Sequence, residues 1–497
     1  MKKALAMALG AMLVAGAAAP AFAASQIDFK GSYAVTFDNV WNSNFASQKD
    51  NADNDSYFAD RLTLDFTFNA TDEVAVYWRV RGPRDVRWGT SPADAGGNRN
   101  GLVSHFIYGE VKQDWGTISV GRLAHTFVDI GLADLGHSLT YVDGDGLFGY
   151  GSPFDWDTPK DGIRWANRWD NGFQLVAQYN RWATSHDGRD IATPINDAEY
   201  ENVDIFILEP AYLWDGGGAT LALMYARDHV QDLAKLAGKN PTIPASKLQV
   251  PALKAYYINP AVSHNFGDFT VNFEGKAGWG KINDIDPSYR VLGITNLPAV
   301  DEIKAKGYAF YLDFDYNYGP GNVTLAGWWA SGTKVEELEA DNYKGLVGMG
   351  GAFAPFIVAY GDGYGWGNAT NAIAAAEELN NGGVNGIGLD GPANHWAIAI
   401  TGAHAFTDDV TLLYGLCYLS LNKVSDTKYD STGNPVADTK GEKNIGFETD
   451  LGLKVQLLDN LSFTTNLGYL FAGNALKDEN GDKENAYAWY NTLTFSF

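Results

Sequence analysis

Charged residues of opposite sign gather in two stretches of the chain, an arginine-rich one near residue 80 and an aspartate-rich one over 123–160. Across a narrow aqueous passage, such charges would set up a transverse field that sorts solutes by charge, because arginine stays protonated at physiological pH. Salt bridges that fasten the two stretches together are an equally good interpretation, and both can hold at once. The candidate residues are Arg79, Arg81, Arg84, Arg87, Arg122, Arg164, Asp143, Asp145, Asp155 and Asp157.

The direction in which Arg79 and Arg81 point can be inferred from their neighbours. Both alternate with the apolar residues Val76, Trp78 and Val80. In a strand, alternate side chains point to opposite faces. An arginine on a lipid-facing surface costs about 2 to 4 kcal/mol at the bilayer midplane. We therefore expect both arginines on a wet, inward face.

Two acidic turns have carboxylate spacing that could hold Ca²⁺, namely Asp143 with Asp145 and Asp478 with Asp482. The first turn is too short for a calcium loop, and the second lacks the glycine that such a loop needs at its sixth position. Ordinary acidic turns are the preferred interpretation, with loosely bound Ca²⁺ at the loops left open. The sequence otherwise predicts no cofactor. It also predicts no enzyme, because no nucleophile, phosphate-loop or zinc motif occurs in a strand–helix context.

Long stretches of strictly alternating apolar and polar residues must position these charges. In "YAFYLDFDYNY" over 308–318, Phe310, Leu312 and Phe314 share one face and Tyr311 and Asp313 share the other. Such stretches approach the 9 to 11 residues that a tilted strand needs to cross a bilayer. They predict membrane-crossing strands with one apolar and one polar face.

The connections between these strands alternate between short and long, which predicts an antiparallel transmembrane β-barrel of 18 strands, within a range of 16–18. Backbone groups in hydrocarbon must be paired internally, so such a sheet has to close. Short turns rich in Gly, Asn and Asp are expected at 69–73, 114–116, 170–172, 215–218, 267–268, 319–322, 407–409 and 458–460. Long connections are expected at 39–56, 82–102, 123–160, 181–203, 228–251, 280–305, 332–393, 422–444 and 473–484.

Residues 1–23 have the charged, apolar and small-residue regions of a secretory signal peptide, with cleavage near Ala23. Residues 24–497 then form a single barrel domain. The net charge of −24 argues against a nucleic-acid partner. The lone Cys417 excludes an internal disulfide framework.

Two long connections are candidates for narrowing the barrel, whose interior is too wide to be filled by its own side chains. The segment 123–160 is rich in glycine and has a length suited to folding inward as a constriction. The segment 332–393 is also glycine-rich and holds a short helix expected at 371–379. Its role is left open between a lid, a plug and a surface cap.

The chain ends on "NAYAWYNTLTFSF", in which Trp489, Leu493, Phe495 and Phe497 share one face. In a soluble protein such a terminus would leave a row of apolar side chains in water. We expect this face to contact lipid.

Together with this ending, "IDFKGSYAVTFDNVWNSNF" near the start and "YGEVKQDWGTISVGRL" resemble the outer membrane homotrimeric porin family of sulfate-reducing bacteria, within the general bacterial porins. The resemblance implies passive diffusion of ions and small hydrophilic solutes across the bacterial outer membrane. It also implies a homotrimer, contact with outer-membrane lipid and lipopolysaccharide, and a last strand that the barrel assembly machinery recognises as an assembly signal.

Two alternatives stay open. The first is a substrate-specific channel, in which aromatic side chains of the loops stack on one ligand. The second is a barrel enzyme with paired acids and histidine at its rim.

Overall fold

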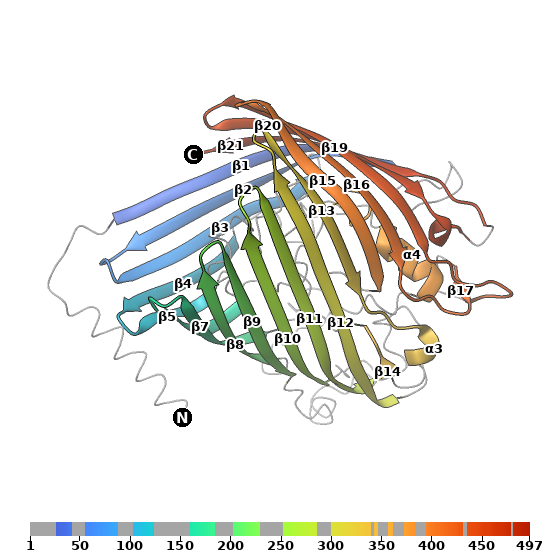
Figure 1. The fold of residues 1–497 in the computed structure, drawn as a ribbon, viewed down its shortest axis with the longest axis horizontal. Helices are drawn as coiled ribbons and strands as arrows, with labels where there is room; N and C mark the ends of the chain where they lie inside the picture. Colours follow the sequence, from blue (N-terminus) through green and yellow to red (C-terminus); the bar gives the residue numbers. More distant parts are fainter. Residues whose placement is uncertain are drawn as a thin grey trace, which may run out of the picture.

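The computed structural model describes residues 26–41, 55–87, 103–123, 160–183, 202–228, 252–285, 300–338, 342–345, 356–360, 372–382, 394–430, 435–478 and 481–497. Eighteen long strands dominate these ranges and belong to one sheet (Figure 1). They are β1 (Gln26–Trp41), β2 (Asp55–Asn69), β3 (Val74–Arg87), β4 (Val103–Gln113), β5 (Gly116–Leu123), β6 (Lys160–Arg168), β7 (Phe173–Ala183), β8 (Asn202–Trp214), β9 (Gly217–Asp228), β10 (Ala252–Asn265), β11 (Phe269–Ile285), β12 (Val300–Asn317), β13 (Gly321–Ala330), β15 (His395–Thr407), β16 (Val410–Leu421), β19 (Asn444–Leu458), β20 (Leu461–Ala472) and β21 (Ala486–Ser496).

Each of these strands pairs antiparallel with its neighbours along the chain, and the ring closes where β21 pairs with β1. The closing register runs from Ser32 opposite Ser496 to Trp41 opposite Tyr487. Figure 1 shows these two strands side by side, with the C terminus beside β1. Closure leaves no unpaired sheet edge, so the backbone groups of every strand find partners within the wall. The predicted 18-stranded antiparallel barrel is confirmed.

The predicted alternation of connections is also confirmed. Short turns join β2 to β3, β4 to β5, β6 to β7, β8 to β9, β10 to β11, β12 to β13, β15 to β16 and β19 to β20. Every other connection is long and joins strand ends at the opposite end of the barrel, which we call the loop end. Both ends of the strand ring lie at the short-turn end, because β1 begins there and β21 ends there.

The two faces of the wall differ in chemistry as the sequence predicted. On β12, Phe310 and Phe314 point outward with 44% and 36% of their surface exposed, whereas Tyr311 and Asp313 point inward and are buried. A soluble protein shows the reverse pattern, with apolar residues inside. An outward apolar band with a polar interior is the arrangement of an outer-membrane barrel.

Short elements sit at the loop end. Within the seventh long connection (331–394, the seventh loop) lie α3 (Val335–Leu338), β14 (Asn342–Tyr343) and α4 (Ala372–Asn381), the last of which confirms the expected short helix. The alanines of α4 favour helix formation. The eighth connection (422–443, the eighth loop) holds β17 (Lys428–Tyr429) and β18 (Pro435–Val436), and η5 (Asn474–Leu476) follows β20. Among the described helices, none combines the length and the apolar character that crossing a membrane would require.

Candidate pore lining

Arginines on β3 line one side of the interior. Arg79 lies inward and forms a two-point ion pair with Asp65 of β2, with N–O distances of 2.6 and 2.9 Å. Its guanidinium also lies 5.2 Å from the ring centre of Phe106. Arg81 lies two residues farther on, on the same inward face, and is 4% exposed. Both arginines therefore line the interior, where the alternation of the sequence placed them.

Arg164 extends this basic side to β6. One of its terminal guanidinium nitrogens donates to Ser119 Oγ at 3.3 Å, and its guanidinium carbon lies 5.9 Å from the ring centre of Tyr108. Ser119 in turn donates to Glu110 Oε2 at 3.2 Å. The basic side, with Arg79 and Arg81 on β3 and Arg164 on β6, is therefore held in place by hydrogen bonds and ion pairs within the wall.

Carboxylates of β11 and β12 face this basic side across the barrel, since β12 is the ninth strand on from β3 in a ring of eighteen. Asp313 accepts from Asn272 Nδ2 and from Tyr311 OH, both at 2.7 Å. Glu274 accepts from Asn259 Nδ2 at 3.1 Å. Glu274 and Asp313 are each 2% exposed.

The opposed charges lie at similar depth. Counted from the short turns, Arg79 is the sixth residue of β3, Glu274 is the sixth of β11, and Asp313 is the fifth of β12. Carboxylates of the wall therefore lie opposite Arg79 at a similar depth. The acidic residues predicted for this role in the segment 123–160 lie outside the described residues. Alternation with Phe310, Leu312 and Phe314 in the sequence was the signal that marks Asp313 as inward.

Arg122 does not belong to the inward set, contrary to our expectation. It pairs directly with Ile107 of β4, which is 45% exposed on the outer face. Arg122 shares that outer face and contacts Asp161 at 3.2 Å. The reason is its position in the strand, since Arg122 has the parity of the outward Ile118 and Val120.

Several predicted residues lie outside the part of the chain that the structure describes. The side chains of Arg84 and Arg87 are among them, as are Asp143, Asp145, Asp155 and Asp157. Asp478 and Asp482 are described and form a closed turn, in which Asp482 N–H donates to Asp478 Oδ1 at 2.9 Å and Asp478 N–H donates to the Asp482 carbonyl at 2.8 Å. Among the described residues, no group of three or more His, Cys, Asp or Glu side chains is placed to hold a metal.

A segment of the seventh loop, Phe356 to Tyr360, lies inside the barrel against β19 (the 356–360 turn). Its backbone N–H groups at Val358 and Ala359 donate to the carboxylate of Glu448 at 2.6 and 2.8 Å. The N–H of Ile357 donates to Asp450 at 3.0 Å. Both carboxylates are fully buried. This anchor is not among the predicted site residues, although alternation with the outward Phe447 and Leu451 marks both acids as inward.

The neighbouring strand β20 leaves room for the 356–360 turn. A Cβ atom added to Gly468 would lie 2.9 Å from the Cβ of Ile357 and 2.8 Å from Asp450 Oδ1. Glycine is therefore required here for the close approach of the turn to the wall. Tyr360 at the end of the turn contacts His395 Nε2 at 2.7 Å and accepts from Trp328 Nε1 at 2.6 Å, which ties the turn to β13 and β15 as well.

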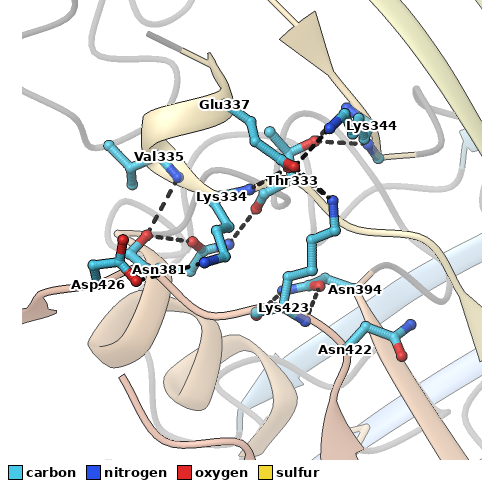
Figure 2. Close-up of polar contacts among 12 residues, drawn as sticks. Thr333, Lys334, Val335, Glu337, Lys344, Asn381, Asn394, Asn422, Lys423 and Asp426 are labelled. Atoms are coloured by element: carbon cyan, nitrogen blue, oxygen red, sulfur yellow. Dashed lines mark hydrogen bonds and ion pairs between the residues drawn. The ribbon is translucent and has the colours of Figure 1, made fainter. Parts of the chain in front are cut away.

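The seventh loop is also tied to the eighth, as Figure 2 shows. Glu337 of α3 accepts from Lys344 Nζ at 2.7 Å and from Lys423 Nζ at 2.8 Å. Burial alone would raise the pKa of Glu337, but hydrogen bonds from Lys344, Lys423 and the backbone N–H of Lys334 hold that pKa at about 2. Asn394 completes the tie by exchanging two hydrogen bonds with the backbone of Lys423, at 2.9 and 3.0 Å.

No family model and no curated protein matches the sequence. Among solved structures, the chain is similar to the outer membrane protein OpdK from Pseudomonas aeruginosa, with 10% identity over 95% of this chain and 99% of that one, at a TM-score of 0.47. It is similar to an anion-selective porin from Comamonas acidovorans, with 14% identity over 95% and 100% of the two chains, at a TM-score of 0.44. It is also similar to OmpT, an outer membrane protein of Vibrio cholerae, with 10% identity over 95% and 98%, at a TM-score of 0.37. Similarities this weak say nothing about function, and the assignment of the fold rests on the strand pairing.

Proposed function

We propose that the protein is an outer-membrane porin, a water-filled channel for passive diffusion of ions and small hydrophilic solutes. The observation that carries the proposal is the closed ring of 18 strands with an apolar outside and a polar inside. A ring of this size is too wide for its own side chains to fill. The proposal includes no catalytic step and no cofactor.

The proposed constriction combines three parts. The basic side at Arg79, Arg81 and Arg164 faces the acidic side at Glu274 and Asp313. The 356–360 turn narrows the interior from the third side, next to β19. The segment 123–160 is the sequence-based candidate for a fourth part, with Asp143, Asp145, Asp155 and Asp157 as its charges.

We further propose a homotrimer in the bacterial outer membrane, after removal of a signal peptide near Ala23. The family resemblance is what supports the trimer.

Planar-bilayer recording of the purified protein tests the channel. We expect discrete conductance steps, grouped in threes for a trimer, and a reversal potential in a salt gradient that reports the net charge preference. Conductance that saturates or is blocked by one solute would replace the diffusion channel with a substrate-specific one. Hydrolytic activity without any conductance would overturn the channel altogether.

A further inference from the structure

A row of neighbouring aromatic rings, of which all but the first pair are stacked, crosses the outer face of five neighbouring strands. The rings belong to residues that are direct cross-strand partners from β7 to β11. Their centres are 5.2, 6.2, 4.9 and 6.0 Å apart in order. The members of this aromatic row are Tyr179, Phe206, Tyr225, Tyr256 and Trp279.

A charged row runs parallel to the aromatic row, two residues nearer the loop end on every strand. Its members are again direct cross-strand partners on the outer face, from β5 to β12. Six are cations and two are acids, although the whole chain has a net charge of −24. The members of this basic row are Arg122, Asp161, Arg181, Asp204, Arg227, Lys254, Lys281 and Lys304.

The two acids of the row are already paired within the wall. Asp204 accepts from Arg181 Nε at 3.0 Å and from Tyr179 OH at 2.8 Å. Asp161 contacts Arg122 at 3.2 Å. The three lysines of β10 to β12 extend the row beyond these pairs and are exposed. Cations therefore outnumber acids along the row by six to two.

A hollow of about 600 Å³ opens on the outer face at the β5 end of the row. Ile107, Val120 and Ile163 give it an apolar lining, and Arg122, Arg181 and the Asp161 that pairs with Arg122 line it as well. The hollow therefore combines an apolar surface with two guanidinium groups and one carboxylate.

From the middle of the wall toward the loop end, apolar, aromatic and basic side chains follow one another, as do acyl chains, headgroups and phosphates in a membrane leaflet. Apolar side chains contact the acyl chains, and aromatic rings of the Tyr and Trp type prefer the depth of the headgroups. Cations one step farther out lie where headgroup phosphates are found, and arginine binds phosphate through two parallel hydrogen bonds. Clustered Lys and Arg at a membrane surface attract anionic lipid.

We propose that the outer face of β5 to β12 binds the phosphorylated headgroup of an outer-leaflet lipid, with the basic row on the phosphates and the hollow beside it. This inference rests on the proposed placement in the outer membrane. It assigns the lipid-contacting side of the barrel to β5–β12, on the far side of the ring from the closing pair β1 and β21.

Lipid binding to the purified full-length protein tests the proposal. The row variant K254Q/K281Q/K304Q removes three exposed charges and leaves the three arginines of the row in place. The control variant K440Q/K443Q/K477Q removes the same charge from loops. The ligand is lipid A with both phosphates, added in mild detergent and counted by native mass spectrometry. We expect about hundredfold weaker binding by the row variant and wild-type binding by the control.

The phosphate requirement is tested with the same lipid after dephosphorylation, which we expect to bind wild type and row variant equally weakly.

Equal lipid A affinity of wild type and row variant would overturn the proposal. So would a loss of subunits from the oligomer without a loss of lipid, which would make the row a protein contact. The conductance of the row variant tests the channel proposal independently of lipid binding. A variant that still conducts but no longer binds lipid A supports both proposals. A wild type that binds lipid A without conducting would overturn only the channel.

Discussion

Arg79 and Arg122 lie on opposite faces of their strands. Alternation along the strand decides whether each charge faces the interior or the outside of the barrel. Arg79 shares the inward face with Asp65, whereas Arg122 shares the outward face with Ile107. A charge on the inward face acts directly on ions in the lumen. A charge on the outward face is separated from them by the wall and is screened by salt within about 8 to 10 Å.

This difference gives a prediction for ion preference. Replacing Arg79 and Arg81 together by glutamine leaves Asp65 without its cation, so the permeability ratio should move toward cations by about twofold or more. Replacing Glu274 by Gln and Asp313 by Asn should move it toward anions. Reversal potentials in a KCl gradient measure both shifts.

Arg122→Gln is the matched control, since it removes one arginine from the outer face and should leave the reversal potential unchanged. An unchanged ratio in both double variants would show that the constriction lies elsewhere. A shift in Arg122→Gln as large as that of the inward variants would contradict the assignment of the faces.

At the scale of elements, the 356–360 turn depends on carboxylates of β19 for its position. A hydrogen bond contributes about 0.5 to 1.5 kcal/mol, and one to a charged group about 1.5 to 3 kcal/mol. Glu448 receives two hydrogen bonds from consecutive backbone N–H groups. The turn is therefore held by a strand that lies about 90 residues away in the chain.

We expect Glu448→Gln to loosen the turn and raise single-channel conductance, because the amide replaces one of the two acceptor oxygens with an NH₂ group that points donors toward the backbone N–H groups. Faster hydrogen exchange at Val358 and Ala359 provides an independent measurement. Asp315→Asn is the control, since Asp315 also points inward but accepts only from Asn322 and Thr324 of the wall. Unchanged exchange at the turn in Glu448→Gln would show that the carboxylate does not hold it.

The tie between the seventh and eighth loops should respond to acid. The pKa of Glu337 is lowered to about 2 from an ordinary value of 4.5, so ionised Glu337 stabilises the tie above pH 4.5. Its contribution is lost as the pH falls from about 4.5 to about 2. We expect protection of α3 from hydrogen exchange to be constant from pH 7 to 5 and to fall below that range.

Glu337→Gln removes the titrating group, so its exchange should lack this acid-dependent step after correction for intrinsic rates. The variant should also show weaker protection of α3 at neutral pH. A wild type and a variant with the same pH profile would rule out Glu337 as the group that controls the tie.

At the scale of the whole molecule, the barrel is complete only when its last strand meets its first. Phe497 exchanges two backbone hydrogen bonds with Gly31, at 2.7 and 2.9 Å, and its ring lies 5.7 Å from that of Phe29. Phe495 and Trp489 are 40% and 44% exposed on the outer face, and Leu493 lies between them on the same face. The terminal residue thus takes part in closure as well as presenting the proposed assembly signal.

We expect Phe497→Ala to lower the free energy of unfolding by about 1 kcal/mol, through loss of the ring contact, and deletion of Phe497 to lower it further by removing both hydrogen bonds. Urea unfolding of refolded protein measures these effects without the assembly machinery. Phe266→Ala is the control, because Phe266 is similarly exposed on a short turn away from the closure. An equal loss in the control would mean that closure has no special dependence on Phe497.

Alternation determined most of the wall from the sequence alone. A period of two residues assigns each side chain to the lipid or to the interior, and Gly, Asn and Asp mark the turns. The inward positions of Arg79 and Arg81 follow from this rule. So does the outward position of Arg122, which lies on the same face of β5 as Ile118 and Val120. These features are local, because every strand carries its own pattern.

Only the tertiary structure decided what meets across the interior. The pairing of the 356–360 turn with Glu448, the room left by Gly468, and the position of Asp313 opposite Arg79 join residues far apart in the chain. No local pattern encodes such contacts, since they depend on how many strands separate two positions around the ring and on how far a loop folds inward. Once the ring is closed, alternation along each strand places every side chain on either the inner or the outer surface. The number of strands between two inward charges then decides whether they face each other across the interior.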